Sequence, residues 1–172
     1  MANINSKTII DVNSSTLVSI STTKFGGRVY ASSEIVDIDR ILAVDDTVML
    51  TRIPTKATIR NVYFSCTDFG SAGAIDIGVF KGEDTDVEGV VPIKRDLFVS
   101  DLNISTSSIL NKDLRYERLS FATMNDNLFK LSGSTETHSL LSYSGYDVGL
   151  TVKTATTATS GQMGIVVIYV TS

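Results

Sequence analysis

The sequence has one cysteine, one histidine, two prolines and no tryptophan. A single thiol, Cys66, cannot form an intrachain disulfide, and no ligand pairs are spaced for structural zinc. The lone histidine, His138, would have to serve any Ser-His-Asp or Cys-His apparatus, and no nucleophile motif accompanies it. We therefore expect no enzyme activity, no catalytic or metal-binding residues and no cofactor. Cys66 follows an apolar run, which predicts a buried small hydrophobe.

Long hydrophobic runs are also missing. No stretch approaches the roughly 20 apolar residues of a transmembrane helix, and residues 1–8 lack the basic region and apolar core of a secretory signal. The net charge is -4, with acids and bases interspersed, so no broad basic surface is available for phosphates. We expect synthesis in a cytosol, and neither a nucleic acid nor a membrane as partner.

Serine and threonine make up about a quarter of the chain, a composition that favours strands and side-chain-bonded turns over helices. Segments rich in valine, isoleucine and tyrosine recur, and they predict strands at 28–38, 47–53, 57–66, 74–80, 127–131, 146–153 and 163–170. Between residues 93 and 119, Phe98 and Leu102 lie four apart, as do Leu110 and Leu114, which indicates one or two short helices. The fold class is therefore all-β: a jelly-roll or Greek-key β-sandwich.

The end of the chain combines two kinds of strand. In residues 146–153 the apolar side chains alternate with polar ones, as in a half-buried strand. The run from Met163 to Val170 is apolar on both faces, so it needs cover beyond its own sheet. We expect two strands around a threonine-rich hairpin, the second covered either by the other sheet or by another subunit.

Residues 1–26 are polar with a few spaced apolar side chains, and they predict an extended N-terminal arm ahead of a sandwich domain at 27–172. Such an arm can be a disordered tail, a segment ordered by a neighbouring subunit, or an ordinary first strand. The pair Gly26-Gly27 fits a hinge between arm and sandwich. The candidate assembly contacts are the apolar residues of the arm and of the last strand: Ile9, Ile10, Leu17, Val18, Ile20, Met163, Ile165, Val167 and Tyr169.

Acidic residues cluster at Glu83, Asp84, Asp86 and Glu88. Hard oxygen ligands on one loop are what calcium needs, but the spacing is not that of an EF-hand loop. A solvated loop tip is the more ordinary interpretation, and ion binding stays the alternative.

Several segments carry a family resemblance. In residues 46–54 a strand ends on a hydrophobic-Pro pair, residues 57–62 carry Ala-x-Ile, and residues 74–80 contain the pattern hydrophobic-Asp-hydrophobic-Gly. With 27–31, 96–106 and 146–170, these segments resemble small structural proteins of tailed-bacteriophage heads, over most of 27–171. The chain is similar to the capsid cement, or head decoration, proteins of the jelly-roll type.

The resemblance implies a virion protein, made in the host cytoplasm, that sits on the outer capsid surface. Its expected partner is the major capsid protein, whose capsomers it would bridge, and it would self-associate as a homo-oligomer, with a trimer as one form. The family has no catalytic residues, so none are carried over. Two alternatives stay open: a tail, neck or head-fibre adaptor, and a carbohydrate-binding sandwich or hydrolase, against which the missing tryptophan and lone histidine count.

Overall fold

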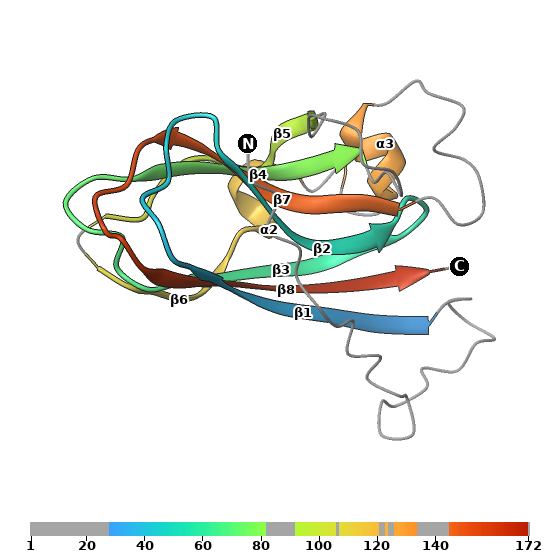
Figure 1. Ribbon diagram of the computed structural model, residues 1–172. Coiled ribbons are helices and arrows are strands. Elements are labelled where there is room, and N and C mark those ends of the chain that lie inside the picture. Colours follow the sequence, from blue (N-terminus) through green and yellow to red (C-terminus); the bar gives the residue numbers. More distant parts are fainter. Residues whose placement is uncertain are drawn as a thin grey trace.

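The computed structural model describes residues 28–81, 92–105, 107–120, 123, 126–133 and 145–171. Within them the chain forms strands and two short helices, drawn in Figure 1. In chain order these elements are β1 (Arg28–Ile38), β2 (Thr47–Pro54), β3 (Thr58–Cys66), β4 (Ala74–Lys81), β5 (Pro92–Asn103), β6 (Ile109–Asp113), α2 (Arg115–Arg118), α3 (Leu128–Ser132), β7 (Gly145–Thr154) and β8 (Gly161–Thr171).

The strands form two four-stranded antiparallel sheets, in the orders β1-β8-β3-β6 and β2-β7-β4-β5. The first strand pairs with the last, the second with the seventh, the third with the sixth, and the fourth with the fifth. A long hairpin rolled up on itself has this pairing, which is the jelly-roll topology. Figure 1 shows the two sheets as stacked layers, with β1, β8 and β3 side by side in one. The expected jelly-roll sandwich is confirmed.

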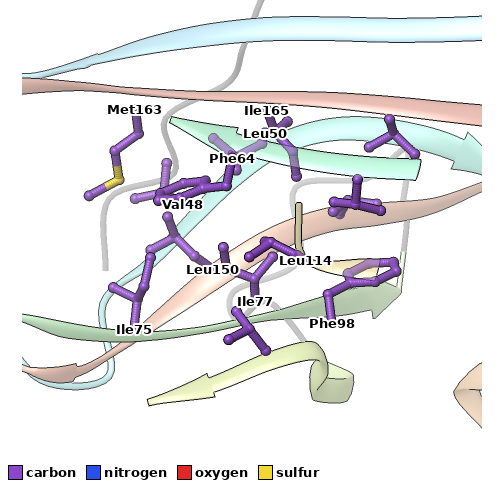
Figure 2. Packing of buried hydrophobic residues seen from close by; sticks show 14 of the residues in the cluster. Val48, Leu50, Phe64, Ile75, Ile77, Phe98, Leu114, Leu150, Met163 and Ile165 are labelled. Atoms are coloured by element: carbon purple, nitrogen blue, oxygen red, sulfur yellow. The ribbon is translucent and has the colours of Figure 1, made fainter. Parts of the chain in front are cut away.

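The core lies between the two sheets. Successive residues of a strand point to opposite faces, so every second side chain faces the other sheet. Figure 2 shows these side chains interleaved, among them Phe64 and Met163 from one sheet and Val48, Leu150 and Ile75 from the other. All five are almost fully buried. The alternation expected in β7 is confirmed, because its core-facing residues are the apolar ones.

The prediction that the last two strands form a hairpin is wrong. Strands β7 and β8 belong to different sheets and do not pair, so residues 155–160 cross from one layer to the other. The buried Thr156 holds this crossing beside the β1–β2 connection: its Oγ1 accepts a hydrogen bond from the Leu42 amide, and its amide donates to the Leu42 carbonyl. Alternation reports which face of a strand is buried and carries no information about the partner strand.

Two local expectations are also corrected. Phe98 and Leu102, spaced as on a helix, lie on β5, where register shifts opposite β4 break the two-residue alternation. Residues four apart share one face of a regular strand as well as of a helix, so this spacing alone does not separate the two. Residues 127–131 were expected as a strand. Asn127 instead caps the helix α3, and residues 128–131 form most of that helix. Of the two short helices, α2 lies within the range 93–119 where a helix was expected, and α3 lies after it.

Candidate assembly surface

The outer face of the β2-β7-β4-β5 sheet carries ion pairs between neighbouring strands. Asp76 on β4 is only 3% exposed, and its Oδ1 accepts hydrogen bonds from Ser100 Oγ at 3.1 Å and the Asp101 amide at 2.8 Å. Arg95 Nε lies 3.6 Å from Asp76 Oδ2, and Lys153 Nζ lies 3.8 Å from Oδ1. The buried carboxylate is therefore compensated by donors and cations from β5 and β7.

Gly78, two residues along the same strand, lets β5 approach closely. A Cβ at this position would lie 2.0 Å from the Lys94 carbonyl oxygen and 2.5 Å from the Arg95 carbonyl carbon. No side chain fits there, because real Cβ atoms do not approach backbone that closely. The hydrophobic-Asp-hydrophobic-Gly pattern therefore has a structural explanation: Asp76 and Gly78 both hold the main chain of β5 against β4.

The rest of this face carries further polar groups. Arg52 of β2 donates two hydrogen bonds to the Asp147 carboxylate of β7, at 2.7 and 3.0 Å. Met49 lies over Gly149, where a Cβ would meet its sulfur at 2.9 Å, and Met49 itself is half-buried. This outer face therefore carries charged and polar side chains together with Met49, and the β5 main chain lies close to it at Gly78.

The outer face of the β1-β8-β3-β6 sheet is different in character. Its outward positions on three neighbouring strands include half-buried apolar side chains, interspersed with polar ones such as Ser33, Asn61 and Ser65, and Ile35 is 69% exposed. Cross-strand register joins Val29 with Val170, Ala31 with Ile168, and Tyr63 with Val166. We call this set the outer apolar face: Val29, Ala31, Ile35, Tyr63, Val166, Ile168 and Val170.

The structure places the expected β8 contacts on the inner side of the same strand. Met163, Ile165, Val167 and Tyr169 face the other sheet, and each is 9% exposed or less. Buried core side chains cannot touch another subunit without opening the sandwich, so the expectation for these four residues is corrected. The outward residues of β8 are the ones available for contact.

The remaining expected contacts, Ile9, Ile10, Leu17, Val18 and Ile20, lie outside the described residues. So do His138 and the acidic cluster from Glu83 to Glu88. The arm boundary at residue 26 likewise stays a prediction.

The single cysteine is a core residue, as expected. Cys66 is 4% exposed on β3. Burial raises the pKa of its thiol, a backbone hydrogen bond with Ile109 opposes that rise, and the negative charge of Asp68 adds to it. A thiol with a raised pKa is a poor nucleophile at neutral pH.

A surface pocket of about 290 Å³ lies where α2 and α3 meet β5. It has basic side chains on its wall, but Arg118 pairs with Asp96 at 2.8 Å and Lys130 pairs with Asp126 at 2.8 Å. Across the described ranges, no group of three or more His, Cys, Asp or Glu side chains is arranged to hold a metal ion. No helix among the residues that the structure describes is long and apolar enough to cross a membrane.

Comparison with known proteins identifies relatives of the fold. No protein-family model matches the chain, and no curated protein matches it in sequence. Among solved structures, a chain of the capsid of Ralstonia phage GP4 is similar, with a TM-score of 0.52 and 11% identity over 83% of this chain and 84% of that one. A chain of the cyanophage Pam1 capsid asymmetric unit has a TM-score of 0.41 and 16% identity, over 86% and 88% of the two chains. The likeness to the Ralstonia phage chain shows that the two share a fold over most of their lengths.

Proposed function

We propose that this chain is a structural protein of a bacteriophage virion, and that it acts as a cement protein on the outer surface of the head. The observation that carries the proposal is the shared fold with a chain of the Ralstonia phage GP4 capsid, which extends over 83% of one chain and 84% of the other. The resemblance of residues 27–171 to head decoration proteins supports the same role. The proposal assigns the protein no catalytic activity.

The outer apolar face is the part of the sandwich best suited to bind a capsid. Contiguous apolar patches on a soluble domain mark interaction sites, and here the patch runs across β1, β8 and β3. The outer face of the other sheet carries ion pairs instead, among them Arg52–Asp147 and Arg95–Asp76. We assign the outer apolar face to the contact with the major capsid protein.

Binding of this kind stabilises a shell by mass action. A protein that binds the closed lattice, and not the separated subunits, shifts the equilibrium towards the shell and slows its irreversible disassembly. A lattice offers many identical sites, so each contact can be weak. Self-association around a rotation axis would place like faces of several copies against adjacent capsomers.

The test uses phage particles that lack the protein, to which purified variants are added. We expect Ile168→Lys, on the outer apolar face, to lower occupancy about tenfold or more, because burying a lysine in an apolar contact costs at least about 1.4 kcal/mol. The matched control is Met49→Lys, a half-buried apolar residue on the outer face of the other sheet. Thermal unfolding of both variants checks that each is folded.

Two outcomes would contradict the proposal. Equal occupancy of the two folded variants would show that the outer apolar face is not part of the contact with the capsid. Electron microscopy of particles carrying labelled protein distinguishes the locations: many copies over the head support a cement role, whereas a few copies at one vertex identify a tail, neck or fibre adaptor instead.

A further inference from the structure

Strand β1 is an edge strand of its sheet. Among the described residues it pairs with β8 on one side and with no strand on the other (Figure 1). The pairing with β8 runs from Arg28 to Ile38 without a register shift, and β1 contains no proline, no glycine and no residue at positive φ. An edge of 11 regular residues presents a row of backbone donors and acceptors to any strand that can align with it.

The other three edge strands of the described sheets each carry a feature that hinders pairing. Strand β2 has a register shift opposite β7 and ends on Pro54. Strand β5 begins with Pro92, has register shifts opposite β4, and holds Asp101 at φ +61°. Strand β6 has only five residues, with Asn111 at φ +50°. Prolines, bulges and short length are common means of protecting a sheet edge, so β1 is the edge that is left regular.

The β1 edge also holds a buried carboxylate. Glu34 is only 7% exposed, and burial raises the pKa of its carboxyl, with no opposing hydrogen bond or cation among the described residues. Ser32, two residues earlier on the same side of β1, is 1% exposed, and its hydroxyl shares a hydrogen bond with the Thr51 hydroxyl. A buried carboxylate without a donor is unfavourable. A strand that brings a hydroxyl to Glu34 would therefore suit this edge.

A second copy of β1 meets this requirement. Two identical antiparallel strands pair around a twofold axis, and residues directly opposite each other lie on the same side of the sheet. With Ser33 on the axis, all 11 residues of each strand are paired, and Ser32 of each copy lies opposite Glu34 of the other. The Ser32 hydroxyl can then accept a hydrogen bond from Thr51 and donate one to the carboxylate.

The neighbouring registers of the same pairing fit less well. An axis at Glu34 would bring two buried carboxylates together, and like charges directly opposite each other are destabilising. An axis at Ser32 would place Glu34 opposite Tyr30 and leave one end of each strand unpaired. The axis at Ser33 is therefore the register that both uses the full strand and supplies Glu34 with a hydroxyl.

We propose that this chain forms a twofold dimer in which β1 pairs antiparallel with β1 of a second copy, with Ser33 on the axis. The β1-β8-β3-β6 sheets of the two copies then form one continuous sheet. Ala31 lies opposite Ile35, which is 69% exposed in the single chain, so the outer apolar faces of the two copies join into one surface. The inference does not rest on the proposed function, because it concerns the free protein in solution.

The first test is a single engineered thiol in the full chain, with Cys66→Ala removing the native one. In Ser33→Cys the two thiols face each other across the axis, where Cα separations of about 4.5–5.5 Å suit a disulfide. The control is Ile35→Cys, whose two thiols would lie about 13 Å apart along the strands. We expect mild oxidation to link most Ser33→Cys chains into dimers and few Ile35→Cys chains, as read by mass spectrometry under non-reducing conditions. Random collision would favour the control, because Ile35 is the more exposed residue.

The second test uses charge at the axis and needs no cysteine. Ser33→Lys and Ser33→Glu each place two like charges directly opposite each other, so each variant alone should raise the dimer dissociation constant about fivefold at low salt. An equimolar mixture pairs lysine with glutamate, and we expect it to dimerise about as well as wild type. Sedimentation velocity measures the dissociation constants, and circular dichroism checks that each variant is folded.

Three results would overturn the dimer: a wild-type chain that stays monomeric up to its solubility limit, equal linking of the two thiol variants, or a charge mixture that dimerises no better than either variant alone. Hydrogen exchange gives a further readout. We expect β1 amides to exchange more slowly as the protein concentration is raised, while β3 amides do not change. Protected β1 amides in a monomeric chain would show an edge that is covered within one subunit, and would equally overturn the proposal.

Discussion

Two residues of β4 show how single side chains decide where a strand lies. Asp76 gathers a hydroxyl, an amide and two cations from neighbouring strands, and Gly78 leaves room for the β5 main chain. Both residues hold β5 against β4. Asp76 attracts polar and charged groups of β5, and Gly78 lacks the Cβ that would collide with the β5 main chain. This pattern, one of several that carried the family resemblance, is therefore explained by packing within the monomer, and it says nothing about a partner.

Gly78→Ala should lower the free energy of unfolding by about 3 kcal/mol, because the new methyl group would overlap the Lys94 carbonyl and force β5 away. The matched control is Gly164→Ala, where the added Cβ would meet the Glu34 carbonyl oxygen at 3.4 Å and Ile35 at 3.5 Å. We expect the control to lie within about 0.5 kcal/mol of wild type. Urea unfolding followed by circular dichroism measures both, and equal midpoints would refute the close approach.

At the scale of elements, α3 shows where a sequence pattern is ambiguous. The run from Leu128 to Leu131 is too short for its apolar spacing to separate a strand from a helix. The helix is decided by its ends: Asn127 Oδ1 accepts a hydrogen bond from the Lys130 amide at 2.9 Å, and Gly133 ends the helix at φ +70°. Asparagine before a helix and glycine after it are both readable in a sequence, so these end signals could have corrected the strand prediction.

Asn127→Ala should cost about 1 kcal/mol of stability, because the Lys130 amide loses its acceptor. Asn127→Asp keeps an acceptor of the same shape and should remain within about 0.5 kcal/mol of wild type. Differential scanning calorimetry of the two variants provides the comparison. An alanine variant that unfolds at the same temperature as the aspartate variant would show that the cap does not stabilise the protein.

The whole molecule is organised by pairings between distant parts of the chain. In the β1–β8 pair, Arg28 lies opposite Thr171, so nearly the whole domain intervenes between the two partners. Strand pairs of this kind form only after long loops have closed, which is why sandwiches with many non-local pairs fold slowly.

We therefore expect the main refolding phase to have a time constant between about 1 ms and several seconds, as for other domains dominated by non-local strand pairs. Stopped-flow dilution from urea measures this time constant. Interrupted unfolding identifies any slower phase that is caused by isomerisation at Pro54 or Pro92. Refolding within microseconds would contradict the picture of a rolled long hairpin.

The sequence by itself determined the all-β class, most of the strands, the burial of Cys66 and the apolar face of β7. These features are local, because a period of two and the burial of apolar side chains are visible within a few residues. The tertiary structure decided the rest. On β8 both faces are apolar, so only the other sheet could select Met163 for the core and leave Val166 on the outer face. Strand partners were likewise decided by long-range packing, because no local pattern records which distant strand will supply the missing hydrogen bonds.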